Sequence, residues 1–371
     1  MTITQVEIQL IAVVVAVACA LPGVFLVLRR MAMMSDAISH TVLLGIVIVF
    51  FIVEDINSPL LIAGAAVMGL ITVSLVELLN RTRLVREDAA IGLVFPALFS
   101  LAVILISRFA GDVHLDSDAV LLGELAFAPF DRLVIAGSDV GPVALYTMTG
   151  VLLLNLTFIL IFYKELKLAT FDAALAAALG FSPGLIHYGL MGLVSITAVG
   201  AFDTVGSILV VALMIAPPVS AYLLTDRLTT MLGLSAVFAA IGAITGYWVA
   251  HWLDANIAGS MAMMLGLIFG VVFLFAPERG MVALAQRRAR QKWEFAQAAL
   301  TIHLLNHEGT PAAAQENRVE HLSHHLRWQP PFAAEVVQRA QRHGLVERHN
   351  GYLALTDDGR QLARETLMLA T

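Results

Sequence analysis

Cysteine and charged residues are both scarce in this sequence, and each shortage excludes a class of protein. The single cysteine, Cys19, lies in an apolar stretch, so the chain has neither a disulfide framework nor a cysteine metal cluster of its own. Charged residues make up 13% of the 371 positions, about half the share that is usual in soluble domains. Together with 59% hydrophobic residues and a mean hydropathy of +0.85, this composition predicts a membrane protein with several spans.

Signatures of nucleotide-hydrolysing and other hydrolytic enzymes are also missing. The chain has only three lysines, Lys164, Lys167 and Lys292, and no G-x-x-x-x-G-K-[ST] motif. It therefore cannot be its own P-loop ATPase. Neither G-x-S-x-G nor H-E-x-x-H occurs, which leaves hydrolase functions without support. The formal net charge of −6 gives no sign of a nucleic-acid-binding surface.

Apolar runs long enough to cross a bilayer follow one another through most of the chain. About 20 residues make one span, and nine runs qualify: 7–28, 36–53, 58–79, 88–107, 142–163, 184–200, 204–224, 229–251 and 258–276. Basic residues follow the first, third, fifth, seventh and ninth runs, whereas the opposite connections carry acidic residues. By the positive-inside rule, this pattern predicts an N-terminus outside and a C-terminus in the cytoplasm.

Asp36 and His40 are the most informative residues within these runs. They stand four positions apart at the start of the second run, which places a carboxylate and an imidazole on one face of a helix. An ionisable group at mid-bilayer costs roughly 2.5–3.5 kcal/mol on insertion scales, which favours a functional role. The alternative is helix capping, in which Ser35 or Asp36 caps the helix near the interface and a neighbour satisfies His40. The spacing alone leaves both interpretations open.

The segment 111–142 is too polar for an ordinary span and is rich in Gly, Asp and Pro. It is predicted to form an external or re-entrant gating element, because irregular backbone at membrane depth survives only where protein or a cavity covers it. Glu124, in its apolar part, is a minor candidate for an entry path. A solvated loop carboxylate is the commoner situation for such a residue.

A second informative segment covers residues 200–218. Gly206 and Ser207 allow close helix contact in lipid, and Pro217-Pro218 is predicted to break the helix near its inner end. Asp203 stands at the outer mouth of this segment. It either meets the Asp36/His40 site or faces water, and the pathway role is only weakly favoured.

A short helix is predicted between the fifth and sixth runs, over the sequence FDAALAAALG at 171–180. Asp172 can cap it, and Gly180 followed by Pro183 ends it. It is too short to span a membrane, lies on the predicted cytoplasmic side, and has small residues that allow a partner to dock closely. It is either the surface on which a motor subunit pushes or a plain alanine-rich connector.

The composition changes near residue 285, so 1–285 are predicted to form a membrane domain and 286–371 a small cytoplasmic α+β domain. Basic residues at 287–292 can meet anionic lipid at the membrane surface. A helix at 333–343, a hairpin at Asn350-Gly351 and a helix from Asp357 predict a winged-helix-like fold.

The charge and histidine content of this tail bear on its function. From Glu294 onward there are seven arginines, no lysine and nine acidic residues, which disfavours DNA binding. Seven of the eleven histidines lie here, and His321, His324 and His325 share one helix face. That spacing can bind a divalent metal ion, although solvent-facing histidines are the commoner explanation.

Three ordered motifs resemble those of the ABC-type permeases that take up manganese, zinc and iron(II). Residues 35–45, SDAISHTVLLG, resemble the family motif GDALSHAVLPG, with Leu44 where the family often has proline. Residues 171–180 resemble its FDPELARALG coupling helix, and 205–217 match its VGSILVVALLIAPAA segment, with Pro218 in place of the usual alanine. More weakly, the tail is similar to the winged-helix domain of diphtheria-toxin-repressor-like metalloregulators.

The resemblance covers about residues 8–285 and implies an all-helical permease with about eight or nine spans. In that family pattern, Asp36 and His40 line the translocation path and handle the cation. The residues that would transmit ATPase motion are Phe171, Asp172, Leu175, Ala176, Leu179 and Gly180. Mixed carboxylate and imidazole ligands suit Mn²⁺, Fe²⁺ and Zn²⁺, and the absence of a thiolate argues against a Cu(I) path.

We therefore expect a non-enzymatic permease subunit that imports divalent metal ions across a bacterial cytoplasmic (inner) membrane. No intrinsic cofactor is expected, since the metal ion is cargo and ATP binds a partner ATPase. The other expected partners are an extracytoplasmic metal-binding protein that selects the ion, a second permease, identical or different, and membrane lipid, but no nucleic acid. One alternative is a membrane-anchored metal sensor whose tail binds DNA or a partner. Another is an ion-coupled secondary carrier.

Overall fold

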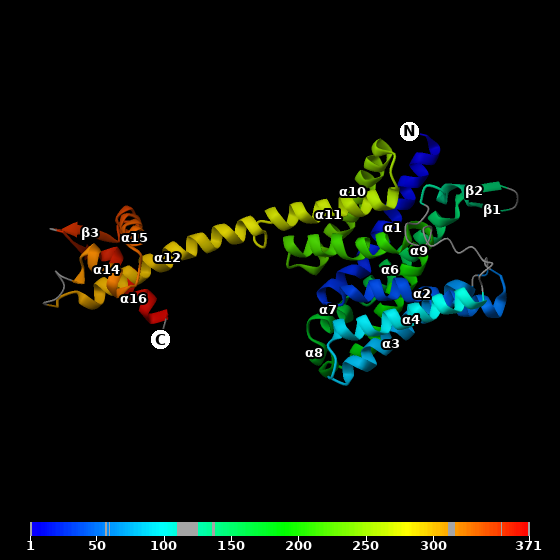
Figure 1. Cartoon of the computed structure of the whole chain (residues 1–371), viewed down its shortest axis with the longest axis horizontal. Helices are drawn as coiled ribbons and strands as arrows, with labels where there is room; N and C mark the ends of the chain where they lie inside the picture. The colour runs from blue at the N-terminus through cyan, green and yellow to red at the C-terminus, as the bar shows by residue number, and fades with distance from the viewer. Residues whose placement is uncertain are drawn as a thin grey trace. The chain divides into compact units, whose positions relative to one another are not determined.

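A computed structural model describes residues 2–55, 58, 60–109, 125–135, 138–310, 316–349 and 351–369 of the chain. The chain divides into two compact units, Met1–Gly280 and Met281–Thr371. In the first, the membrane unit, the long helices are α1 (Ile3–Leu28), α2 (Ala32–Val53), α3 (Leu60–Arg81), α4 (Glu87–Phe109), α6 (Val143–Ile161), α9 (Pro183–Leu224), α10 (Leu228–Leu253) and α11 (Ile257–Phe275) (Figure 1).

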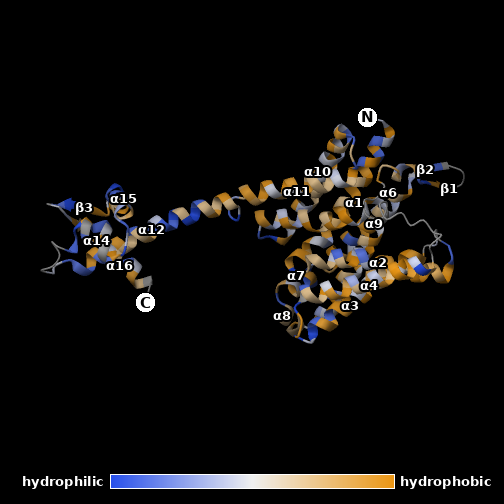
Figure 2. Ribbon diagram, in the orientation of Figure 1, coloured by the Kyte–Doolittle hydropathy of each residue, from blue (hydrophilic) through white to orange (hydrophobic). Residues whose placement is uncertain are grey.

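Within the described residues, nine helical segments are long and apolar enough to cross a membrane, with α9 contributing two of them. This confirms the predicted number of spans. The ends of each span fall within four residues of the prediction, since apolar content and length together determine where a spanning helix begins and ends. Figure 2 shows these helices mostly in orange, and many of their large apolar side chains are exposed, as a lipid-facing surface requires.

Helix α1 is the most completely buried of the spans and packs against α6, α9 and α10. Its close approach to α9 depends on Gly23, because a Cβ at this position would clash with the backbone of Met214. A second group consists of α2, α3 and α4, which lie side by side (Figure 1). Helix α9 joins the two groups, since it contacts α1 and α10 as well as α2 and α3.

Helix α9 bends at Gly206 and does not break at the proline pair. Gly206 has φ +76° and ψ 164°, a conformation available only to glycine. The predicted break at Pro217-Pro218 is wrong, because the helix runs through both prolines to Leu224. Prolines remove two backbone donors, but packed neighbours and serine hydroxyls make such losses tolerable in membrane helices. The buried positions of Gly206 and Ser207 agree with the predicted close helix contact.

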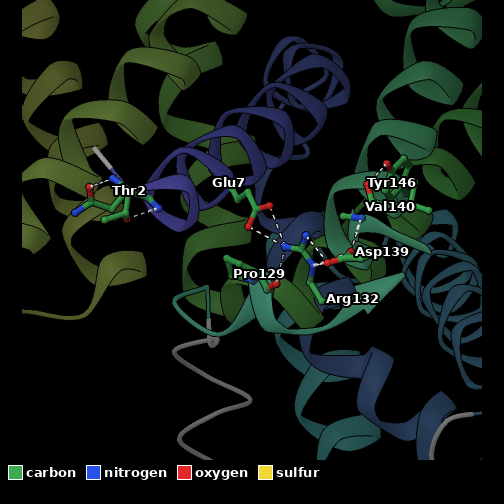
Figure 3. Close-up of polar contacts among 9 residues, drawn as sticks. Thr2, Glu7, Pro129, Arg132, Asp139, Val140 and Tyr146 are labelled. Carbon is green, nitrogen blue, oxygen red and sulfur yellow. Dashed lines mark hydrogen bonds and ion pairs between the residues drawn. The ribbon is translucent and has the colours of Figure 1, made fainter. Parts of the chain in front are cut away.

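A short hairpin between α4 and α6 is fastened to α1. Strand β1 (Arg132–Ile135) pairs antiparallel with β2 (Ser138–Pro142), after the 3₁₀ turn η1 (Ala128–Phe130). Arg132 lies between Asp139 of β2 and Glu7 of α1, donating to both carboxylates at 2.9–3.0 Å (Figure 3). Hydrogen bonding from Arg132 lowers the pKa of Asp139. Of the predicted gating segment 111–142, the part that includes Glu124 lies outside the described residues.

The second unit contains α12 (Met281–His307), α14 (Val319–His325), α15 (Pro330–Arg342), β3 (Val346–His349), β4 (Tyr352–Leu355) and α16 (Asp357–Leu369). The predicted helix, hairpin and final helix are all present, and β3 pairs antiparallel with β4. Its apolar core includes Leu300, Val336 and Leu353. Whether these elements make a true winged helix remains a prediction.

Candidate functional site

The Asp36–His40 pair lies inside helix α2, one turn apart. His40 Nε2 is 3.4 Å from Asp36 Oδ1, and the two side chains are 24% and 33% exposed, respectively. The helix begins at Ala32 after Met31, and no side chain caps it. The capping interpretation of Ser35 and Asp36 is therefore wrong, and the two ionisable groups occupy interior positions of a membrane helix.

Aromatic rings of α4 cover the imidazole of His40. The ring centroids of Phe95 and Phe99 lie 5.1 Å and 5.8 Å from that of His40. Among the described residues, the recorded ion pairs connect Asp36 and His40 only to each other. The site thus offers a carboxylate and an imidazole in a mostly apolar setting, and no Arg or Lys of the described part of the chain is ion-paired with it.

Hydroxyl groups beside the pair are satisfied within the helix bundle. Ser39 Oγ donates to the carbonyl of Ser35 at 2.8 Å, and Thr41 Oγ1 donates to that of Ala37 at 2.9 Å. Thr72 Oγ1 of α3 donates to Thr41 Oγ1 at 2.8 Å. The Thr72–Thr41 bond holds α2 against α3 and so helps fix the face on which Asp36 and His40 stand, whereas the other two bonds lie within α2.

The other two predicted pathway residues cannot be located relative to this pair. Glu124 lies outside the described residues, and the side chain of Asp203 is not among those that the structure describes. The backbone of Asp203 belongs to α9, three residues before the bend at Gly206. Both residues stay predictions.

A second polar cluster, which sequence reasoning missed, joins the ends of α1, α3, α7 and α9. Arg29 Nε donates to Thr170 Oγ1 at 3.1 Å, and Arg29 Nη1 lies 3.4 Å from His187 Nδ1. His187 Nε2 is 3.9 Å from Glu77 Oε2, while Arg81 Nη2 is 2.6 Å from Glu77 Oε1. Burial lowers the pKa of Arg29. Glu77 and His187 were detectable as ionisable residues inside predicted spans, which are functional candidates by default.

This cluster borders a cavity of about 210 Å³. Its lining residues are Met31, Met34, Val73, Val76, Glu77, Asn80 and His187. Glu77 Oε2 and Arg29 Nη2 are buried and make no hydrogen bond to any described residue. Because Arg81 pairs with the Glu77 carboxylate and Arg29 lies beside His187, the negative charge of this cluster is already compensated. It therefore attracts a cation less than the Asp36–His40 pair does.

The short helix predicted over 171–180 is α8 (Ala173–Ala178), which directly follows α7 (Tyr163–Phe171). Asp172 caps α8 as expected, since its Oδ1 accepts a hydrogen bond from the Leu175 amide at 2.9 Å, and Gly180 ends the turn with φ +87°. The Ala176 side chain is buried. Three exposed apolar side chains lie along this segment: Phe171 ends α7, Leu175 is on α8 and Leu179 follows α8.

Two of the three predicted metal-sensing histidines, His321 and His325, stand one turn apart on α14 near the Glu316 carboxylate. The side chain of the third, His324, is not among those described. The rings of two histidines of α12, His303 and His307, lie close to His325, and no local spacing predicted this meeting.

The nine segments able to span a membrane within the described residues define a polytopic membrane protein. Residues 4–276 match the model of the ABC 3 transport family, and the chain belongs to this family. The chain is 49% identical to the zinc transport system membrane protein TroD of Treponema pallidum, over 97% of this chain and 98% of that protein. It is 47% identical to the manganese transport system membrane protein MntD of Bacillus subtilis, over 76% of this chain and 95% of that protein.

A solved structure agrees with this assignment. PsaBC from Streptococcus pneumoniae, in complex with Fab, is matched with a TM-score of 0.63 and 28% identity, over 77% of this chain and 96% of that one. The family assignment confirms the predicted permease fold, and nothing in the comparisons supports the regulator alternative. The match to TroD extends over 361 residues and therefore includes most of the C-terminal unit.

Proposed function

We propose that the chain is the permease subunit of an ATP-binding-cassette importer for divalent transition-metal ions, Mn²⁺, Fe²⁺ or Zn²⁺. The observation that carries this proposal is the Asp36–His40 pair, a carboxylate and an imidazole 3.4 Å apart inside a membrane helix. These oxygen and nitrogen ligands suit first-row divalent ions. The names of the relatives, which concern zinc and manganese transport systems, support the same cargo class.

The pair acts as a transient binding step for the ion. A carboxylate supplies charge to a desolvating cation, and the imidazole supplies a neutral nitrogen ligand. Two protein ligands hold an ion weakly enough for release, which conduction requires. Such a site cannot choose among these metals by affinity alone, so an external metal-binding protein selects the ion.

The chain lies with its N-terminus outside and its C-terminus in the cytoplasm of a bacterial inner membrane. Basic residues gather at the ends of α1 and α3 and around α7, which is the cytoplasmic pattern. The Arg132-anchored hairpin then belongs to the outer face, together with the start of α1. The first unit is the membrane domain and the second unit the cytoplasmic domain.

A separate ATPase drives transport through α8. Exposed Leu175 of α8, with Phe171 at the end of α7 and Leu179 just after α8, gives a partner an apolar surface. The buried Ala176 fixes α8 against the membrane unit. Thr170, just before α8, accepts a hydrogen bond from Arg29 at the end of α1. Movement of α8 thereby reaches α1, and through His187 and Glu77 it reaches α9 and α3. A second permease, identical or different, completes the pathway.

Uptake of radiolabelled Mn²⁺, Fe²⁺ and Zn²⁺ tests the site in cells that express the full transport system. Asp36→Asn and His40→Ala should each abolish uptake of the cargo metal while the complex still assembles. His251→Ala is the matched control, because this exposed histidine at the end of α10 stacks on Tyr247 and lies far along the chain from the pair. Normal uptake in both site variants would contradict the proposed pathway.

The secondary-carrier alternative predicts a different energy source. If ATP is depleted while the membrane potential is kept, an ATP-driven importer stops, whereas an ion-coupled carrier continues. Persistent uptake under these conditions would overturn the ATPase assignment. The metal site would still be tested separately by Asp36→Asn and His40→Ala.

A further inference from the structure

Two pairs of histidines with the same spacing lie in the C-terminal unit. His303 and His307 stand on α12, and His321 and His325 stand on α14. In each pair three residues separate the histidines, so both imidazoles project from one helix face. An H-x₃-H pair on a helix is a spacing that recurs in zinc sites.

The fold brings the two pairs together. The ring centroids of His303 and His307 are 4.7 Å apart, and that of His325 lies 5.7 Å from His303 and 6.4 Å from His307. Glu316, just before α14, adds a carboxylate. One ligand atom from each of Glu316, His321 and His325 falls within 4.8 Å of the others.

The arrangement differs from a group of histidines that merely face solvent. His303 is only 8% exposed, and its Nε2 lies 3.5 Å from the carbonyl oxygen of Glu316. Glu316 Oε2 is buried and lies 2.8 Å from His325 Nε2, yet makes no hydrogen bond of good geometry to any described residue. Among the described residues its recorded ion pair is with that imidazole nitrogen, and a metal ion bound by both groups would satisfy this oxygen.

We propose that Glu316, His321 and His325 form a binding site for a divalent transition-metal ion, with His303 beside it as a fourth ligand or support. Tetrahedral bonds of about 2.0–2.1 Å bring ligand atoms to roughly 3.3 Å from one another. Small side-chain rotations therefore suffice to close the site from its present spacing. One carboxylate and several imidazoles, without thiolate, select the Zn²⁺, Co²⁺, Fe²⁺ and Mn²⁺ class over Cu(I).

Occupancy of this site would tie α14 and Glu316, three residues before it, to α12 through His303. If the proposed function and orientation hold, and this consequence rests on them, the site faces the cytoplasm and meets the ion after transport. It then reports internal metal to the permease and slows uptake when metal is abundant.

Metal binding is tested on the full-length chain in detergent, in an Asp36→Asn/His40→Ala background in which the transport pair cannot contribute. Co²⁺ is the probe, because its visible absorption reports coordination by nitrogen and oxygen ligands. The parent should bind Co²⁺ and show a ligand-field band that Zn²⁺ displaces. His321→Ala/His325→Ala should lose the band, and Glu316→Gln should weaken binding by about 10-fold or more.

The matched control is His349→Ala, which removes an exposed histidine of β3 in the same unit. It should bind Co²⁺ like the parent. Equal binding by the parent and the His321→Ala/His325→Ala variant would overturn the site. If that double variant fails to fold, Glu316→Gln decides, since it keeps the side-chain shape, and unchanged affinity there overturns the proposal. Because transport plays no part in this measurement, its failure is distinct from failure of the proposed importer function.

Discussion

Two acid–imidazole pairs lie in the membrane unit, and they differ in the charges around them. Asp36 and His40 interact with each other beside two phenylalanine rings. Glu77 and His187 instead lie between two arginines, with Arg81 on the carboxylate and Arg29 beside the imidazole. Each pair joins a carboxylate to an imidazole. The carboxylate of the first pair is available to a cation, whereas that of the second is already paired with Arg81.

The difference teaches that residue type alone does not identify an ion site in a membrane helix. A guanidinium within contact distance satisfies a carboxylate and repels an arriving cation. The first pair is therefore the better cargo ligand. The second is better suited to holding α1, α3, α7 and α9 together near α8.

The largest effect on transport is expected from placing an arginine beside Asp36, as Arg81 lies beside Glu77. His40→Arg removes the imidazole ligand and places a guanidinium beside Asp36, so uptake of the cargo metal should be abolished, as for His40→Ala. Metal uptake in cells measures it, with His251→Arg as the control that adds the same charge at the exposed end of α10. Retention of most of the uptake by His40→Arg would refute the role of counter-charge.

Neutralising the second pair should affect stability more than transport. Glu77→Gln leaves Arg81 and His187 without their carboxylate, and the melting temperature should fall by about 2–4 °C, the shift that about 1 kcal/mol produces in a domain of moderate size. Thermal unfolding of the purified chain measures this, with Glu54→Gln, at an exposed helix end, as control. Complete loss of uptake with unchanged melting would instead make Glu77 part of the ion path.

The link between this cluster and α8 should have an intermediate effect on transport. Thr170→Val removes the acceptor for Arg29 Nε, and uptake should fall about threefold, since one hydrogen bond contributes about 0.5–1.5 kcal/mol. ATP hydrolysis by the assembled complex should persist. Thr147→Val on α6 is the control, because that hydroxyl bonds only to its own helix. Equal uptake in the two variants would exclude this hydrogen bond from coupling.

The smallest effect is expected from the aromatic cover of the first pair. Phe99→Leu removes one ring near His40, and the KM for metal should rise about twofold, as an aromatic contact of about 0.5 kcal/mol implies. The concentration dependence of uptake measures it. Phe109→Leu is the control: the ring of Phe109, on the same helix, packs against Phe51, so its loss should leave the KM unchanged. A similar KM in both variants would mean that the rings only fill space.

Sequence alone predicted the features that depend on local pattern. Apolar length predicted the spans, the capping ability of Asp172 predicted α8, and the Asn350-Gly351 pair predicted the β3–β4 hairpin. Each of these features depends on residues that are close together in the sequence, so it can be predicted without knowing the fold.

The features that sequence reasoning missed depend on distant contacts. Arg29 meets Thr170, which lies 141 positions away, and no periodicity predicts such a meeting. His303 and His325 likewise belong to two different helices, and their closeness follows only from the fold. The break predicted at Pro217-Pro218 was wrong for the opposite reason. The local sequence favoured a break there, but packing in the membrane unit keeps α9 helical through both prolines.

The bend at Gly206 has a mechanical consequence. The half of α9 before it is bonded to α3 and α6, through Ser195 to the carbonyl of Ala66 and through Thr197 to Asn155. The half after it lies against α1 at Gly23. Since the hydrogen-bond ladder is interrupted between them, twist applied to one half is not passed rigidly to the other. Helix α9 therefore consists of two segments joined at Gly206, of which, among the described residues, only the first is bonded to α3.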